Sequence, residues 1–504
     1  MQQGAPSQIA SFVGGVRSAA AVRPNQIAIQ DDERAITYAD LMRAAERAAA
    51  AFARDGLKSG DVIAICAANS VAYGAVYVAA ALAGIVTAPL PQSATDEALA
   101  KMIVDCGARI VFADADNFDR LTNAGARVVA LDGVETWWAA APLHSSTCDI
   151  SGEHAFNIIY SSGTTGAPKG IVQSHAMRDA HVRLAQACGY DTDTVTLLST
   201  PLYSNTTLVS FLPTIALGGT AILMRKFDVE GFLQRAQEHR ATHTMLVPVQ
   251  YKRLLESPRF SAYDLSSFKQ KFCTSAPFAA DLKRQVLDRW PGALTEYYGM
   301  TEGGGLCILF ADQFPDKLHT VGRPAPDNDI RLVDDEGREA PQGEIGEVVG
   351  RSGSFMKGYH KRSADTAAAF WHSPNGLRFM RTGDVGRFDE DGFLILMDRK
   401  KDVIISGGFN IYSSDLEDVL RSHPAIDDVA VVGAPSEKWG ETPVAFVVCN
   451  APIDCNELLA YANERLGKLQ RLAEVQKMER LPRNAIGKIL KRELREAARQ
   501  RAIR

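Results

Sequence analysis

The sequence predicts an α/β protein with a large N-terminal domain of layered mixed β-sheets and covering helices, followed by a small α+β domain. The first observation is composition: of 504 residues, 46% are apolar, 8% aromatic and 23% charged, as in proteins with a packed core. The second is an alternation of strand-like apolar runs with helical periodicity, for example at 61–66, from Val71 onward and at 109–113. The third is a charged segment, 398–402, that precedes a stretch long enough for a domain.

The elements follow in order along the chain. An uncharged stretch of about 20 residues from Val71 is long enough to raise the question of a membrane span. Its alanines, glycines and tyrosines, and the prolines that end it, favour a buried helix instead. An apolar run at 155–159 is predicted to be a buried strand. The charged segment marks a boundary between domains at 1–398 and 399–504.

Charge and cysteine usage exclude several classes of protein. Fifty-five Lys and Arg against sixty Asp and Glu give a net charge of −5, which disfavours nucleic acid as a partner. The 8 cysteines include no C-x-x-C pair, so neither a zinc cluster nor a secreted disulfide framework is indicated. No signal peptide is readable in residues 1–24. We therefore expect a cytoplasmic protein without a transmembrane segment; the sequence leaves a homodimer open.

The strongest local signal is the segment 160–170, which follows the predicted strand. Three glycines and four Ser or Thr residues let backbone N–H groups and hydroxyls surround a polyphosphate, and Lys169 adds a positive charge. The pattern differs from the P-loop of kinases, because Pro168 and Gly170 stand where that loop needs Gly and Ser or Thr. An ordinary surface loop would not require a lysine and a proline at these positions. The segment predicts a phosphate cradle.

This loop resembles the phosphate-binding signature of the acyl-adenylate-forming superfamily, which includes acyl- and aryl-CoA synthetases, adenylation domains of peptide synthetases and beetle luciferases. Six further segments match the family's motifs in the family's order. They are 296–302, 343–347, 381–384, 398–402, 406–411 and 481–490. The resemblance implies the acyl-CoA synthetase fold, in which the C-terminal domain is small and mobile.

The resemblance also implies a two-step reaction that uses ATP, Mg²⁺ and coenzyme A. A carboxylate first attacks the α-phosphate to give an acyl-adenylate and pyrophosphate, and a thiol then displaces AMP. Lys488, Thr301 and Glu302 correspond to the catalytic positions, with Glu302 as the magnesium ligand. Fixed positive charge and a carboxylate for a hard cation suit a reaction at a crowded phosphorus centre.

Nucleotide binding is implied for a larger set of residues. Asp384 resembles the aspartate that accepts both ribose hydroxyls, a role that suits a carboxylate because it has two acceptor oxygens. Arg399 would contact the ribose or the phosphate, and Tyr298 would lie along the adenine. The full set implied for ATP and AMP is Ser161, Ser162, Gly163, Thr164, Thr165, Gly166, Lys169, Ser275, Ala276, Pro277, Tyr298, Gly299, Thr301, Asp384 and Arg399.

Four residues correspond to the family's hinge and CoA positions. Lys401 occupies the hinge, where backbone rotation would exchange the adenylation and thioester-forming arrangements. Gly407 and Gly408 would let the pantetheine arm pass close to the backbone, because neither carries a Cβ. Trp439 resembles a tryptophan placed against the CoA nucleotide, although packing on the small domain's own sheet explains it equally well.

The acyl pocket departs from the common pattern. Ser204 stands where many relatives have a gating histidine, which His175 or Tyr203 would have to replace in part. Tyr297 stands where malonate-activating relatives carry an arginine, so a small dicarboxylate is disfavoured and an apolar monocarboxylate, aromatic or medium to long chain, is expected. The predicted pocket residues are Tyr203, Ser204, Cys273, Thr274, Tyr297 and Gly303.

Three functions follow from these matches. The main prediction is an AMP-forming carboxylic acid–CoA ligase. A stand-alone adenylation enzyme that loads the thiol of a carrier protein is the alternative within the superfamily. A catalytically silent binding protein would have lost Lys488, Glu302 or Asp384, and the sequence keeps all three.

Overall fold

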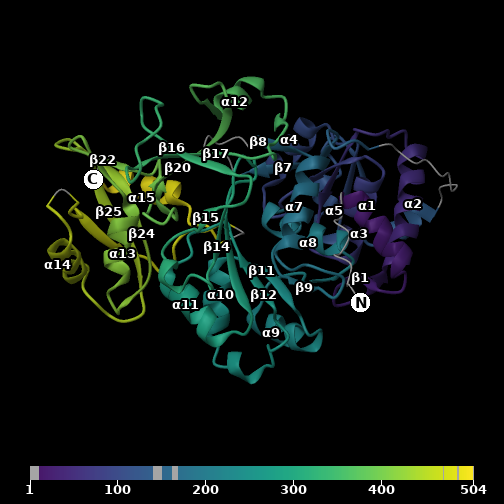
Figure 1. Cartoon of the computed structure of the whole chain (residues 1–504), viewed down its shortest axis with the longest axis horizontal. Helices are drawn as coiled ribbons and strands as arrows, with labels where there is room; N and C mark the ends of the chain where they lie inside the picture. Colours follow the sequence, from purple (N-terminus) through teal and green to yellow (C-terminus); the bar gives the residue numbers. More distant parts are fainter. Residues whose placement is uncertain (1–10, 140–149, 162–168, 469, 485–486, 503–504) are drawn as a thin grey trace. The chain divides into compact units, whose positions relative to one another are not determined.

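The computed structural model describes residues 11–139, 150–161, 169–468, 470–484 and 487–502. The chain forms two compact units. Unit 1 contains Met1–Leu318, Ala325–Asn328 and Arg351–Met380, and unit 2 contains His319–Pro324, Asp329–Gly350 and Arg381–Arg504. Layers of helices and strands in each unit give the predicted α/β class (Figure 1).

One sheet of unit 1 has the strand pattern of a mostly parallel, buried sheet. Its strands are β1 (Ile27–Gln30), β2 (Ala35–Thr37), β9 (Val195–Leu198), β10 (Thr220–Leu223), β11 (His243–Leu246), β12 (Gln270–Cys273), β13 (Ala293–Tyr298) and β14 (Cys307–Phe310). They follow the order β14-β13-β12-β11-β9-β10-β1-β2. Pairs from β13 through β1 are parallel, whereas β14 and β2 pair antiparallel.

The second sheet of unit 1 carries the predicted phosphate segment. Its strands are β3 (Val62–Cys66), β4 (Val86–Pro89), β5 (Ile110–Ala113), β6 (Arg127–Ala130), β7 (Ala155–Ser161), β8 (Lys169–Ser174) and β18 (Gly358–Tyr359). They follow the order β18-β8-β7-β4-β3-β5-β6. The apolar run at 155–159 thus forms a strand, as predicted, and β7 and β8 pair antiparallel on either side of the loop.

Helices cover these sheets. They are α1 (Phe12–Val22), α2 (Tyr38–Arg54), α3 (Val71–Leu82), α4 (Asp96–Cys106), α5 (Ala115–Leu121), α6 (Val134–Ala139), α7 (His175–Ala187), α8 (Asn205–Ala216), α9 (Val229–Glu238), α10 (Pro248–Glu256), α11 (Ala280–Arg289) and α12 (Ser363–Ala368), with 3₁₀ turns at Phe260–Ala262 and Pro315–Lys317. Helix α7 packs on β7, β8 and α8, and α8 covers β9, β10 and β11 (Figure 1). These two helices therefore lie between the two sheets.

The apolar stretch that begins at Val71 forms α3, and every residue of this helix is buried. Ser70 caps it by accepting from the backbone N–H of Tyr73, which satisfies one of the free donors at a helix start. The prediction of a buried core helix is confirmed. Among the described residues, no helix is both long and apolar enough to cross a bilayer.

Unit 2 contains two further sheets. The first has β16 (Asp329–Val333), β17 (Gly346–Arg351), β20 (Arg378–Phe388) and β21 (Leu394–Arg399), in the order β16-β17-β20-β21; the short strand β15 (Arg323–Pro324) also lies in unit 2. The first residues of β20, 378–380, belong to unit 1, where they pair with β19 (Phe370–His372).

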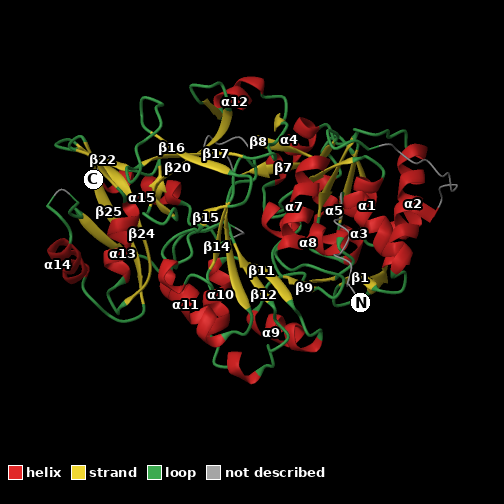
Figure 2. Ribbon diagram, viewed as in Figure 1, coloured by secondary structure: helices red, strands yellow, loops and turns green. Residues whose placement is uncertain are grey.

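The second sheet of unit 2 is formed by C-terminal residues. It contains β22 (Ile404–Ser406), β23 (Phe409–Ile411), β24 (Ile426–Ser436), β25 (Gly440–Cys449) and β26 (Glu474–Lys477), with the order β23-β22-β25-β24 and β26 beside β25. Helices α13 (Ser413–Arg421) and α14 (Cys455–Arg465) contribute to one apolar cluster with this sheet, and α15 (Lys491–Ala502) contributes to another. Figure 2 shows α13 and α15 against the strands.

The predicted domain boundary at residue 398 lies inside unit 2, and it stays a prediction. Strand β21 ends at Arg399 and pairs with β20, so residues before and after 398 belong to the same unit. Asp398 also accepts hydrogen bonds from the backbone N–H and the hydroxyl of Ser413, with the N–H donor at 2.7 Å. These contacts attach the segment before the predicted boundary to the residues that follow it.

Candidate functional site

The predicted phosphate loop connects two described strands. Lys169 begins β8 opposite Ser161, the last residue of β7. Its Nζ lies 5.1 Å from the ring centroid of Tyr359 and 3.4 Å from Oδ2 of Asp365. Ser162, Gly163, Thr164, Thr165 and Gly166, and the side chain of Ser161, lie outside the described residues. Of this motif, the structure therefore places the lysine and the strands that present the loop.

Tyr359 joins Lys169 to the predicted magnesium ligand. Its hydroxyl donates to Oε1 of Glu302 at 3.0 Å, while Lys169 lies over its ring. Burial and the nearby Glu302 carboxylate raise the pKa of Tyr359, so the phenol stays protonated and donates. The structure thus brings Lys169 and Glu302 together in unit 1. Sequence reasoning missed Tyr359, because nothing in its local pattern links it to the loop.

A buried amide supports Thr301. Nε2 of Gln173, a fully buried residue of β8, donates to the backbone carbonyl of Thr301 at 2.6 Å. The backbone N–H of Met356 donates to the carbonyl of Glu302 at 2.8 Å. These two bonds fix the backbone of the predicted catalytic pair. Tyr298, at the end of β13, and Gly299 lead directly into it.

Ser275 has a strained backbone in the segment predicted to contact AMP. Its φ is 80°, a value that is uncommon for a residue with a Cβ and costs of order 1–3 kcal/mol. Its hydroxyl lies 2.6 Å from the hydroxyl of Thr206, in the first turn of α8. Ser275 and Pro277 are exposed, and Thr274 and Ala276 are half-buried. Strain held in an accessible loop is typical of binding sites.

The predicted acyl residues do not share one face. Tyr297 and Phe272 stack at 5.4 Å between ring centroids. Cys273 follows Phe272 in β12, and successive side chains of a strand point to opposite faces. Burial raises the pKa of the Cys273 thiol, and the charges of Glu296 and Lys283 beside it have smaller, opposite effects. Cys273 therefore lies on the side of the sheet away from Tyr297, a placement that depends on strand register.

The backbone conformation at position 303 requires glycine. Its φ is 78°, and a Cβ would lie 2.4 Å from the carbonyl oxygen of Ser354.

His175, one candidate to replace the missing gate, is buried with its ring 4.8 Å from that of Phe156, and burial lowers its pKa to about 4. Tyr203, the other candidate, is half-buried, and Ser204 caps α8.

Unit 2 brings Asp384, Arg399 and Lys488 together. Nε of Arg399 lies 2.9 Å from Oδ1 of Asp384, and the two residues are directly opposite each other on β20 and β21. Burial, with the positive charges of Arg399 and Lys401, lowers the pKa of Lys488 to about 8, although Asp384 and Asp402 oppose the shift. A lysine, a carboxylate and a guanidinium from three distant motifs thus form one cluster.

Two hydrogen bonds join Lys488 to Asn484. The backbone N–H of Lys488 donates to Oδ1 of Asn484 at 2.9 Å, and the N–H of Asn484 donates to the carbonyl of Lys488 at 3.0 Å. Gly487 has a φ of 79°, a conformation that glycine adopts without steric cost.

The predicted hinge and CoA residues also lie in unit 2. Burial lowers the pKa of Lys401, the residue at the predicted hinge. The backbone N–H of Gly407 donates to the carbonyl of Trp439 at 2.8 Å, and a Cβ at Gly407 would lie 3.0 Å from the indole. Gly408 has a φ of 83° with open space around it. The indole is 45% exposed, so its ring is accessible to a ligand.

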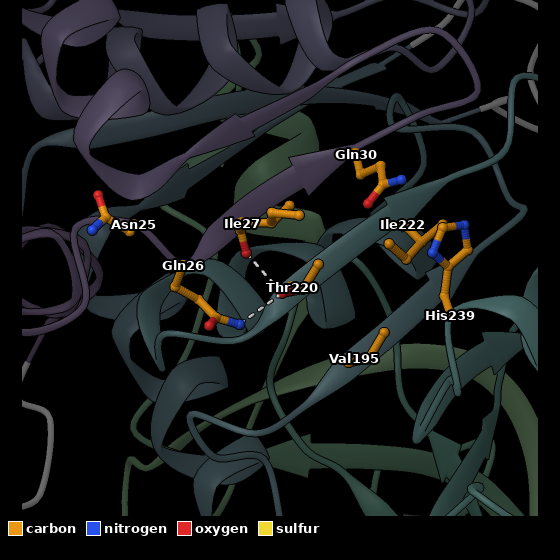
Figure 3. A pocket seen from close by; sticks show the side chains of 8 residues that line it. All are labelled: Asn25, Gln26, Ile27, Gln30, Val195, Thr220, Ile222 and His239. Atoms are coloured by element: carbon orange, nitrogen blue, oxygen red, sulfur yellow. Dashed lines mark hydrogen bonds between the residues drawn. The ribbon is translucent and has the colours of Figure 1, made fainter.

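A cavity of about 370 Å³ lies elsewhere in unit 1, beside β1, β9 and β10 (Figure 3). Thr220 at its wall accepts from Nε2 of Gln26 at 3.0 Å and donates to the carbonyl of Ile27 at 2.7 Å. The other lining residues are Asn25, Gln30, Val195, Ile222 and His239. None of the predicted site residues lines this cavity.

Comparisons with known proteins identify the family. The AMP-binding enzyme family matches residues 16–360, and the AMP-binding enzyme C-terminal domain matches residues 415–488. The chain belongs to the AMP-binding enzyme family. It is 33% identical to a feruloyl-CoA synthase from Amycolatopsis sp over 94% of this chain and 96% of that protein.

Two solved structures of family members have the same fold. ATP-bound MatB from Rhodopseudomonas palustris has a TM-score of 0.88 and 30% identity, covering 97% of this chain and 98% of that one. The O-succinylbenzoate coenzyme A synthetase MenE from Bacillus subtilis, in complex with ATP and magnesium ion, has a TM-score of 0.84 and 27% identity, covering 95% and 98%. The recognised superfamily and the predicted fold are therefore confirmed. This AMP-binding enzyme is an adenylate-forming enzyme of the AMP-forming acid–CoA ligase family.

The residues of this AMP-binding enzyme fit the magnesium ion that its relative holds. Glu302 offers one carboxylate in unit 1, and Mg²⁺ is usually held by one or two carboxylates together with substrate phosphates and water. Among the described residues, no group of three or more His, Cys, Asp or Glu side chains forms a separate metal site. A single carboxylate would suit an ion that is otherwise held by the phosphates of the nucleotide and by water.

Proposed function

We propose that this chain ligates a carboxylic acid to coenzyme A, forming an acyl-adenylate and pyrophosphate first and an acyl-CoA and AMP second. The observation that carries the proposal is the cluster in unit 2, where the amine of Lys488 lies near Asp384 and Arg399 and has a pKa of about 8. An amine that is largely charged near neutral pH stabilises the negative charge that develops at the α-phosphate.

Each unit contributes groups of defined chemistry. In unit 1, Glu302 would hold Mg²⁺, which supplies charge neutralisation at the phosphates when bound, and Lys169 and the backbone around Thr301 would contact the phosphates. In unit 2, Asp384 would accept the ribose hydroxyls, and the exposed indole of Trp439 would contact the CoA nucleotide. Lys401 would act as the hinge between the two half-reactions.

The acid is the partner that the predicted acyl pocket would select. Tyr203 and Tyr297 are half-buried and aromatic, which favours an apolar acid, aromatic or of medium to long chain. The relatives named above as feruloyl-CoA and O-succinylbenzoate-CoA synthetases favour the aromatic class. Loading of a carrier-protein thiol is the second candidate function.

The test uses the purified full-length enzyme and a panel of acids. Pyrophosphate release should require both ATP and an acid, and AMP release should then require CoA. A holo-carrier protein supplied in place of CoA distinguishes the two acceptors. Absence of pyrophosphate release with every acid would overturn the proposal, and transfer to the carrier alone would replace CoA by a protein thiol.

The variant Lys488→Ala tests the role of the amine in the first half-reaction. It should lower adenylate formation by about 100-fold or more, because preorganised charge at the reacting phosphate is a large contribution, but spare thioester formation from supplied acyl-adenylate. Lys468→Ala is the matched control, because Lys468 is an exposed lysine of the same unit. Equal loss of both half-reactions in Lys488→Ala would contradict the role assigned to the amine.

A further inference from the structure

Helix α7 carries a fully buried arginine that no predicted motif contains. Arg178 is 0% exposed. Its Nε donates to Oδ1 of Asn157 at 2.9 Å, and its Nη1 donates to Oδ1 of Asn205 at 3.0 Å. Both acceptors are neutral amides, and within the described part of the chain no carboxylate forms an ion pair with Arg178. A buried guanidinium without a counter-ion is an unusual arrangement.

Arg178 is charged at neutral pH, whereas the histidine beside it is neutral. Nη1 of Arg178 lies 3.4 Å from Nδ1 of His181. Burial, followed by the Arg178 charge, lowers the pKa of His181 to about 3, and burial lowers the pKa of Arg178 to about 10. At neutral pH the histidine is therefore neutral and the guanidinium is charged.

Donors around Arg178 also lack partners. Nη2 of Arg178 is buried without a hydrogen-bond acceptor in the described residues, as are the hydroxyls of Tyr73 and Tyr77 on α3. An aromatic ring connects Tyr77 to Arg178, since Tyr77 lies 6.2 Å from Phe156 and Arg178 lies 5.9 Å over the same ring. Buried donors are nearly always satisfied in native proteins. A guanidinium N–H with no acceptor is best satisfied by oxygen, and a positive charge favours an anionic oxygen.

A line of buried side chains connects Arg178 to the adenylation residues. Asn157 donates to Oε1 of Gln173 at 3.0 Å, and Gln173 donates to the carbonyl of Thr301. Arg178 is thus two amide side chains away from Thr301. These intervening amides separate the guanidinium from the backbone of Thr301, which suits a contact with the tail of an acid and not with its reacting carboxylate.

The other side of Arg178 faces the start of α8. Asn205, its acceptor, follows Tyr203 and Ser204, which we assign to the acyl pocket. Asn205 and His181, the two side chains within hydrogen-bond distance of Nη1 of Arg178, are half-buried rather than buried, so side chains next to the guanidinium are partly accessible. Helices α7 and α8 contact each other over this region.

We propose that Arg178 determines substrate specificity by binding an acceptor oxygen in the tail of the acid, with a carboxylate bound in preference to a neutral group. The inference rests on the proposed function and departs from its apolar acid, because it gives the acid a second oxygen group remote from the activated carboxylate, whereas Tyr297 disfavours only a small dicarboxylate. A site with buried donors rejects analogues that lack the acceptor, because those donors are then left unpaired.

The experiment compares matched acids that differ only in the tail. Straight-chain acids of increasing length, and phenylpropenoic acids, are supplied with either a terminal carboxylate or a methyl group. Wild type should use the carboxylate member of at least one pair about tenfold or more better in kcat/KM for pyrophosphate release. Arg178→Met should abolish this preference mainly through KM, and Arg183→Met, an exposed arginine of the same helix, should keep it.

A binding measurement separates specificity from folding. The preferred acid should raise the melting temperature of wild type and of Arg183→Met, but not that of Arg178→Met. Should Arg178→Met fail to fold, the wild-type preference decides: a methyl member used as well as or better than its carboxylate partner at every length overturns the inference. Equal kcat/KM values of wild type and Arg178→Met for every acid would overturn it too. No turnover of any acid would instead count against the proposed function itself.

Discussion

Lys488 combines two properties that a catalytic amine needs, because it is held in a buried cluster and remains titratable near neutral pH. Burial and the charges of Arg399 and Lys401 lower its pKa from the ordinary 10.5 to about 8. The amine is therefore charged below about pH 8 and neutral above it. Because the unfolded chain keeps its proton up to about pH 10.5, this burial opposes folding below pH 8, and the opposition is relieved between pH 8 and 10.5.

The rate of adenylation should follow this titration. We expect kcat/KM for ATP to fall as the pH rises through about 8, since kcat/KM reports the free enzyme. Pyrophosphate release measured across the pH range checks the prediction. Lys488→Arg is the control, because a guanidinium stays charged and should remove the falling limb at a lower overall rate. A limb that persists unchanged in Lys488→Arg would show that another group titrates.

At the same scale, sequence reasoning found some site residues and missed others for physical reasons. Lys488, Asp384 and Arg399 belong to motifs with recognisable spacing, and the structure brings them together, although their roles stay predictions. Arg178 has no such signal. On a helix, an arginine ordinarily faces water, and only the placement of α7 between two sheets buries it.

At the scale of elements, the glycines after β13 show how backbone geometry decides a residue type. The sequence placed Gly303 in the acyl pocket. The structure shows a φ of 78° and a close approach to the Ser354 carbonyl. The backbone N–H of Gly304 donates to the same carbonyl at 2.9 Å. These contacts hold the segment after Glu302 against the residues before β18.

Gly303→Ala should therefore destabilise unit 1 more than an ordinary substitution at positive φ. Gly60→Ala is the control, because Gly60 has a φ of 89° and nothing within 4 Å of its Cβ position. The control should cost about 1 kcal/mol for the left-handed backbone. Gly303→Ala should cost roughly 2–4 kcal/mol, because the clash adds to that penalty. Urea unfolding of both variants measures the difference, and equal midpoints would mean that the Ser354 segment moves freely.

Strand register accounts for what the motifs could not predict about the elements. The sequence placed Cys273 and Tyr297 in one pocket, because both flank recognisable segments. The pairing of Cys273 with Glu296 in the parallel β12–β13 ladder puts their side chains on one face, while Tyr297 joins Phe272 on the other. A shift of one residue in the pairing register turns every side chain of a strand to the other face of the sheet. The register depends on pairing between segments that are distant in sequence, so the local motifs could not predict it.

At the scale of the molecule, composition, alternation and ordered motifs predicted the α/β class and the family. The domain boundary near residue 398 stays a prediction, since it lies inside one of the two compact units. A charged segment near residue 398 looks like a linker, but Asp398 accepts hydrogen bonds from Ser413, and Arg399 pairs with Asp384. The short local pattern could not reveal this, because the partners come from strands and helices that are distant in sequence.

Nucleotide binding should stabilise the whole enzyme through Glu302. A ligand that binds only the native state raises the free energy of unfolding, by about 2.7 kcal/mol when present at about 100 times its Kd. Mg²⁺ with ATP should therefore raise the melting temperature of wild type, and removal of Mg²⁺ with a chelator should reverse most of the rise. Glu302→Gln should lose the magnesium-dependent part, because an amide oxygen carries no negative charge for a hard cation.

Glu46→Gln is the matched control for this prediction, since Glu46 is an exposed glutamate on α2 of the same unit. It should melt like wild type with and without Mg²⁺ and ATP. Tyr359→Phe tests the neighbouring contact, because it removes the hydroxyl that donates to Glu302 but keeps the ring beneath Lys169. We expect it to keep most of the magnesium-dependent rise. An unchanged rise in Glu302→Gln would place the ion on other oxygens of the nucleotide site and remove Glu302 from the set of ligands.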